Sequence, residues 1–169
     1  EVQKSALLLA AKCHDLGKLR EVFQRELGNA DYRPGDLSTA FAKSAGKRRG
    51  AELCRDYRHE FGSLLDVVHG TNGHALSGQY EQLSEDAQDL VLHLIASHHG
   101  RARPHFPAEE SHDPAPERSQ SQCDRLACDV PRRFARLQRK YGRWGLAYLE
   151  SLLRAADWAA GAASSETGS

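Results

Sequence analysis

The sequence predicts an all-α fold, a compact helical bundle with one long exposed loop around 101–129. Apolar residues recur every three or four positions in several stretches, which is the period of an amphipathic helix. Glycine, asparagine and proline clusters separate these stretches. With 169 residues, 40% of them apolar, the chain can bury one sizeable core, so we expect a single domain over 1–169.

The first four helical stretches are predicted at 2–13, 19–27, 51–68 and from Ser84 to the histidines before Gly100. In the first, Val2, Ala6, Leu9 and Cys13 share one face. Residues 28–50 read as a loop with room for one short helix around 37–44. Ser84 can cap the fourth helix, and the acidic residues after it suit the positive end of a helix.

A last helix, or close pair of helices, is predicted from Pro131 to about Ala160, with Pro131 as a first helical residue. We expect its repeating apolar and aromatic residues to lie in the core rather than to stack on bases: Phe134, Leu137, Tyr141, Trp144, Tyr148 and Leu152. A second face is basic and could meet phosphates or stay solvated: Arg132, Arg136, Arg139, Lys140 and Arg143. Gly142 and Gly145 mark a close helix crossing or a bend.

The composition leaves the partner open. Twenty-three basic and 23 acidic residues give a net charge of zero, so a nucleic acid would have to be met by a local patch. The four cysteines are scattered without a Cys-x-x-Cys pair, which favours a reducing, cytoplasmic setting. No apolar run reaches the length of a membrane span, and no signal peptide is evident. Because the chain starts at Glu1, we expect it to be part of a longer protein.

Metal-binding side chains occur in or at the ends of four predicted helices. His14 and Asp15 are neighbours, about 100° apart on a helix, and the others are His59, His98, His99 and Asp157. His59 alone would more simply be a surface residue, and a cation near a helix C-terminus is favourable in itself. Two histidines ending an apolar segment, however, need partners for their nitrogens. If the helices converge, imidazoles and carboxylates without a thiolate suit Mn, Fe, Co, Ni or Zn used for hydrolysis.

These residues also carry a family resemblance. The order His14-Asp15, Arg58-His59-Glu60, His98-His99-Gly100 and a late helical Asp157 resembles the HD superfamily of metal-dependent phosphohydrolases. Within it, positions 6–160 resemble the HD nuclease domain of the CRISPR-associated helicase-nuclease of type I systems. The tail 133–150 is similar to the type I-G or I-U branch.

The resemblance implies an all-helical fold that holds two divalent metals, Mn, Fe, Co or Ni, with Zn or Mg also compatible. It assigns Asp15 to a bridging position, His14 and Asp157 to the first metal, and His59, His98 and His99 to the second. Family members normally have a further histidine upstream of the His-Asp pair, and none precedes His14 here. Either it lies before Glu1 in the parent protein, or water, His69 or His74 substitutes for it.

The implied reaction is hydrolysis of single-stranded DNA, with two metals activating a shared water. Lys18, one turn past the pair, would hold a phosphate oxygen or simply be a surface lysine, and Arg101 and Arg103 would hold the scissile strand. The implied partners are a superfamily 2-type helicase domain of the same parent chain and an RNA-guided surveillance complex. Two alternatives stay open: an HD hydrolase of nucleotides or cyclic dinucleotides, and a docking module with a weakened metal site.

Overall fold

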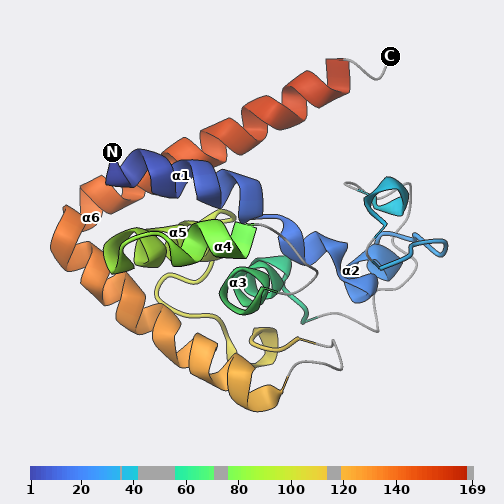
Figure 1. Ribbon diagram of the computed structural model, residues 1–169, viewed down its shortest axis with the longest axis horizontal. Helices are drawn as coiled ribbons and strands as arrows, with labels where there is room; N and C mark the ends of the chain where they lie inside the picture. The colour runs from blue at the N-terminus through green and yellow to red at the C-terminus, as the bar shows by residue number, and fades with distance from the viewer. Residues whose placement is uncertain (35, 42–55, 71–75, 114–118, 167–169) are drawn as a thin grey trace.

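The computed structural model describes residues 1–34, 36–41, 56–70, 76–113 and 119–166, and these residues contain helices and no strand (Figure 1). The α-helices are α1 (Val2–Cys13), α2 (Glu21–Glu26), α3 (His59–His69), α4 (Leu76–Glu81), α5 (Glu85–Ser97) and α6 (Gln120–Glu166). Short 3-10 turns lie at Leu16–Leu19, Leu37–Thr39 and Ala108–Glu110. The all-α prediction is therefore confirmed.

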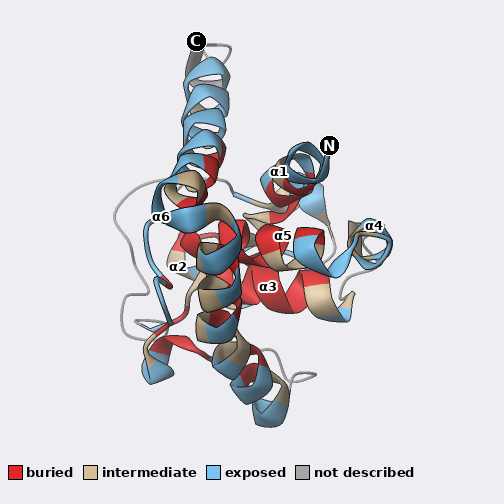
Figure 2. Cartoon of the chain, turned by 90° about the vertical axis from the view of Figure 1, so that its left-hand side faces the viewer, coloured by how far each residue is buried: buried red, intermediate tan, exposed pale blue. Residues whose placement is uncertain are grey.

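The core lies on α3 and α5, which are the most deeply buried helices (Figure 2). Helix α5 packs against α1, α3 and α6, so it is surrounded by other helices. Leu64, Leu65, Leu90, Leu94 and Ile95 are fully buried. Burial of each such side chain stabilises the folded state by about 1.5–3 kcal/mol relative to leaving it exposed. This packing fixes the ends of these helices relative to each other.

Helix α1 runs over the residues that its apolar spacing predicted, and α5 begins after Ser84 as expected. The Ser84 hydroxyl makes no capping hydrogen bond; instead its backbone carbonyl accepts from the Ala87 and Gln88 N–H groups. Glu85 and Asp86 occupy the first turn, where negative charge is favourable. Helix α5 is therefore started by backbone geometry and by acidic residues.

Several predicted boundaries were wrong. The stretch 19–27 is divided into a 3-10 turn and the short α2, and α4 was not predicted. Among the described residues of 51–68, the helix begins only at His59, because Arg58 has extended dihedral angles. Residues 51–55 lie outside the described residues. Of the short helix predicted around 37–44, residues 42–44 also lie outside them, and the described part contains the 3-10 turn Leu37–Thr39.

The predicted loop 101–129 is shorter than expected, because α6 begins at Gln120 and not at Pro131. Cys123, Leu126 and Val130 are buried at helical spacing before the proline. Their burial offsets the cost of a proline inside a helix, about 3 kcal/mol. The remaining loop is also only partly exposed, since Ala102 and Phe106 pack into the core.

Helix α6 bends at Gly142, whose φ of 68° and ψ of 171° interrupt the helical dihedral angles. The bend shifts the buried face, so the apolar repeat that starts at Phe134 does not continue beyond it. Trp144 is 88% exposed and Tyr148 63% exposed, which corrects the prediction that they, and Leu152 with them, lie in the core. Leu146, Leu149 and Leu153 are buried in their place. None of the described helices, α6 included, is long and apolar enough to cross a membrane.

Candidate metal centre

Four helices bring the predicted metal-binding side chains to one place. His14 and Asp15 follow directly after α1, His59 is the first residue of α3, and His98 and His99 follow α5. Asp157 comes from the far part of α6, which packs against both α1 and α5. Helix ends can bring side chains from distant parts of the sequence together without opening the core.

Backbone carbonyl groups orient two of the imidazoles. His14 Nδ1 donates to the Ala11 carbonyl oxygen at 2.9 Å, and His98 Nδ1 donates to the Ile95 carbonyl oxygen at 2.7 Å. In a neutral imidazole the second nitrogen, Nε2, then carries a lone pair and no proton. Both rings therefore present Nε2 as a potential metal ligand, with the tautomer set by the turn before it.

The two oxygens of the Asp15 carboxylate face different groups. Oδ2 lies 2.7 Å from Lys18 Nζ and 3.6 Å from His14 Nε2, whereas Oδ1 lies 3.5 Å from His59 Nε2 and 3.9 Å from His98 Nε2. Burial raises the pKa of this carboxyl, but the Lys18 hydrogen bond and the nearby His14 outweigh it, so the pKa lies below its usual value. Asp15 is thus an anion between two sets of nitrogens.

The second set of nitrogens is neutral and close together. His59 Nε2 and His98 Nε2 are 3.4 Å apart. Burial lowers the pKa of His59 to about 3 and that of His98 to about 4, so both rings are neutral at neutral pH. Two lone-pair-bearing nitrogens that face each other beside an anion form a favourable position for a cation.

In the described part of the chain, two groups of candidate ligands have atoms within 4.8 Å of one another: His59, His98 and His99, and His14, Asp15 and His98. Asp15 Oδ1 is also buried without a hydrogen-bond partner among the described residues, and such an unpaired oxygen is costly unless a cation binds it. The side chains therefore fit divalent metal ions. His98 belongs to both groups, so the two candidate positions adjoin each other.

Asp157 completes the side of the centre around His14. Its Oδ1 lies 3.3 Å from His14 Nε2. Of the possible substitutes for an upstream histidine, His69 ends α3, ten residues beyond His59 and about 15 Å along the helix at the usual rise per residue. It is exposed there and lies at the wrong end of α3 for this role. His74 lies outside the described residues.

Ser63 and Gly17 support the site, although the sequence indicated no such role for them. Ser63 Oγ accepts a hydrogen bond from the Gly17 N–H and lies 2.8 Å from the carbonyl oxygens of both His14 and His59. A Cβ atom on Gly17 would lie 2.0 Å from the His59 carbonyl oxygen. In the sequence, the sign of this supporting role was that Ser63 is a small polar residue within the apolar part of α3.

The predicted DNA-binding residues follow the His98-His99 pair in the chain and are engaged in ion pairs. Arg101 Nη1 is 3.3 Å from Glu110 Oε1, and Arg103 Nη1 is 3.1 Å from Glu150 Oε2. In the basic stripe of α6, Arg136 makes two hydrogen bonds to Asp89 of α5, at 2.7 and 2.8 Å, and Lys140 pairs with Asp86. Part of the stripe therefore joins α6 to α5.

The comparisons with known proteins agree with this geometry. The family described as "Cas3, HD domain" matches residues 1–166 of the chain. No curated protein and no solved structure gave a significant match. The chain therefore belongs to the Cas3 HD-domain family, and this membership implies a metal-dependent nuclease that acts on DNA together with a helicase in CRISPR type I systems.

Proposed function

We propose that this domain hydrolyses phosphodiester bonds of single-stranded DNA at a centre that holds two divalent metals, Mn, Fe, Co or Ni. The observation that carries the proposal is the Asp15 carboxylate, with one oxygen toward His14 and the other toward His59 and His98. A carboxylate in this position suits a bridging ligand. His14, Asp15 and Asp157 would hold the first metal, and Asp15, His59, His98 and His99 the second.

When bound, two such cations lower the pKa of water and neutralise charge on the phosphate oxygens. The protein's part is to keep its nitrogens unprotonated and aimed at one point. The Ala11 and Ile95 carbonyl groups do this for His14 and His98 by accepting from Nδ1. Burial of His59 and His98 favours their neutral form, which is the form that binds a metal.

Lys18 is suited to stabilise developing negative charge on the phosphate. Its ammonium group lies 2.7 Å from Asp15 Oδ2, beside the carboxylate and only part-buried. If Asp15 held the cations, this ammonium would be available to a phosphate oxygen. Lys18 therefore acts in the transition state, and its loss should lower the rate more than the affinity for DNA.

The family and the tail of the chain support a wider assignment. We assign the domain to a parent protein that also carries a superfamily 2-type helicase, which delivers single-stranded DNA after an RNA-guided surveillance complex has opened the target. Residues 133–150 support the type I-G or I-U branch. We also assign Arg101 and Arg103 to binding of the strand, whose phosphates would compete with Glu110 and Glu150 for them.

The test is a nuclease assay with Asp15→Asn, using single- and double-stranded DNA, a panel of divalent metals, and EDTA. Because Asp15 would hold both metals, we expect Asp15→Asn to lose bound metal and essentially all cleavage. Replacement of all four cysteines should leave the metal content unchanged, since no thiolate is among the ligands. Cleavage retained by Asp15→Asn would refute the proposal, and hydrolysis of free or cyclic nucleotides instead of DNA would assign another HD activity.

A further inference from the structure

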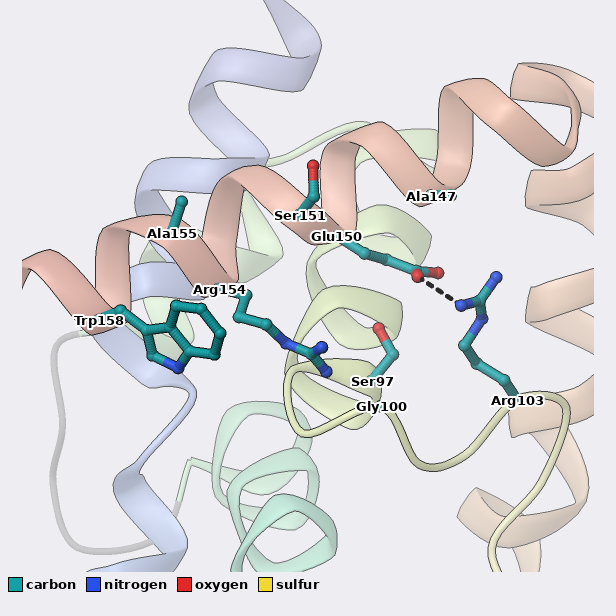
Figure 3. A pocket seen from close by; sticks show the side chains of 9 residues that line it. All are labelled: Ser97, Gly100, Arg103, Ala147, Glu150, Ser151, Arg154, Ala155 and Trp158. Atoms are coloured by element: carbon teal, nitrogen blue, oxygen red, sulfur yellow. Dashed lines mark ion pairs between the residues drawn. The ribbon is translucent and has the colours of Figure 1, made fainter.

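A cavity of about 340 Å³ lies between α6 and the residues at the end of α5 (Figure 3). Its lining includes Ser97 and Gly100 on one side and Ser151, Arg154 and Trp158 of α6 on the other. Sites for small molecules have volumes of about 300–1,000 Å³, so this cavity is large enough for one small ligand. Its lining is mixed, with an aromatic ring, hydroxyl groups and guanidinium groups.

Ser97 gives the cavity an unsatisfied donor. The residue is 2% exposed, and its Oγ has no hydrogen-bond partner among the described residues. Figure 3 shows the hydroxyl directed toward α6, between the side chains of Arg154 and Glu150. A buried hydroxyl without a partner is unfavourable, so a ligand that accepts a hydrogen bond here would remove that cost.

Arg154 supplies a positive charge that no acidic side chain of the described residues neutralises. Its Nε donates to the His98 carbonyl oxygen at 3.2 Å, and within the described residues no carboxylate lies within ion-pair distance of its guanidinium. Glu150, the acid that lines the cavity, is already engaged by Arg103 at 3.1 Å and by His93 at 2.7 Å. The cavity therefore favours an anion, and the remaining N–H groups of Arg154 suit a phosphate.

Trp158 supplies a flat apolar surface at the rim. It is 71% exposed although it is a large aromatic residue, and it lines the cavity next to Arg154. Gly100 leaves space on the opposite side, since a Cβ atom there would lie 2.9 Å from Arg154 Nη2. An exposed indole beside a guanidinium is the combination by which proteins hold the bases and phosphates of single strands.

Residues that line the cavity contact or directly follow residues of the metal centre. Arg154 binds the peptide of His98, and Trp158 follows Asp157 directly in α6. A DNA strand whose phosphate lies at the metal centre would therefore place a neighbouring nucleotide close to this cavity.

We infer that the cavity is a nucleotide subsite, in which Arg154 and Ser97 hold a phosphate of a single strand and Trp158 stacks on the attached base. The inference rests on the proposed function, because it places one more nucleotide of the same substrate. It is separate from the assignment of Arg103 to the strand, because Arg103 is paired with Glu150 whereas Arg154 has no carboxylate partner among the described residues. The subsite would set the register of the strand relative to the metals.

The experiment measures binding of short deoxythymidine oligonucleotides to the metal-free protein in EDTA, so that binding is separated from cleavage. Trp158→Ala should weaken binding about tenfold or more, whereas Trp158→Phe should restore most of it. The loss should be much smaller for an abasic oligonucleotide, which has no base to stack. Arg154→Gln should weaken binding to both, and should reduce the slope of log affinity against log salt by about 0.7, as for one lost phosphate contact.

Two variants of α6 serve as matched controls. Trp144→Ala removes a tryptophan that is even more exposed but does not line the cavity, and Arg125→Gln removes one exposed charge near the start of the helix. Both should leave binding unchanged, and helix content by circular dichroism should be the same in all variants. Equal effects of Trp158→Ala and Trp144→Ala would overturn the inference, and so would an equal effect of Trp158→Ala on the normal and the abasic oligonucleotide. Cleavage by the metal-loaded wild-type protein tests the proposed function separately.

Discussion

Gly17 determines how closely the turn after His14 and Asp15 can approach α3. A Cβ atom at this position would lie 2.0 Å from the His59 carbonyl oxygen and 2.9 Å from its Cα, and backbone atoms cannot yield as a flexible side chain can. We expect Gly17→Ala to displace His59 relative to Asp15 and to lower the cleavage rate about 100-fold, the usual effect of a 1 Å misplacement. Cleavage rate and metal content measure this directly.

Gly78→Ala is the control for that change. Gly78 lies in α4, and a Cβ atom there would meet nothing within 4 Å. Alanine is favoured over glycine inside a helix by roughly 0.5–1 kcal/mol, so the control should be as active as the wild type and no less stable. Similar activity of Gly17→Ala and Gly78→Ala would contradict this account of the close approach.

The side chains that meet in the candidate metal centre could be identified from the sequence because histidine and aspartate at helix ends have few simpler explanations as a set. The residues that support these side chains could not be identified from the sequence. Ser63 lies in a run of buried residues of α3, and its role depends on carbonyl groups that are distant in the sequence. Such contacts follow from how α3 packs on the turn after α1, which residue spacing alone does not specify.

Among the elements, the turn before α2, helix α3 and the loop before α6 meet at a buried ion-pair cluster. Arg20 Nη2 lies 2.8 Å from Asp66 Oδ1 and 2.9 Å from Asp113 Oδ2, and all three side chains are buried. Removing the cation leaves two carboxylates buried together. We expect Arg20→Met to cost about 3–5 kcal/mol, the usual effect of breaking a buried pair, and thermal unfolding would measure it.

The exposed pair of Arg25 and Glu21 in α2 is the matched comparison. Both partners are largely in water, where such pairs contribute at most about 1 kcal/mol, so Arg25→Met should unfold close to the wild-type temperature. If both arginine variants unfold at the same temperature, the buried cluster does not hold these elements together.

Element boundaries were predictable where one periodic pattern covered the whole helix, as in α1. They failed in α6 for two reasons that concern single residues. Pro131 is typical of a first helical residue, yet burial of Val130 and its neighbours keeps it inside the helix. Gly142 allows a bend, and the sequence does not indicate how far the bend rotates the buried face. Trp144 and Trp158 are consequently on the surface.

For the whole molecule, a net charge of zero means that DNA must be attracted by the side of the protein that carries uncompensated cations. Part of the basic stripe is compensated by Asp86 and Asp89 of α5, and so serves helix packing. Arg154, beside the metal centre, is not compensated in this way by the described residues. The metals themselves would add the largest positive charge, next to the same surface.

The metal centre joins four helices, and its two positions should differ in affinity. In the proposed assignment, the second position has three imidazoles and Asp15, whereas the first has His14, Asp15 and Asp157, and no histidine precedes His14 within residues 1–169. Because even an outer-shell partner is commonly worth about 10–100-fold in metal affinity, loss of a direct ligand should weaken the first position at least as much. Calorimetric titration of the metal-free protein with Mn²⁺ should therefore show one tight and one weaker binding event.

Single-ligand variants assign these two events. His99→Ala should weaken the tight event and leave the weaker one, whereas Asp157→Ala should remove the weaker one alone, because these two residues contact opposite sides of the centre. Cleavage should follow the weaker event, so that activity rises only when Mn²⁺ is added in excess. Two equally tight events in the wild-type chain would refute the inequality and would mean that another group, such as His74 or water, completes the first position.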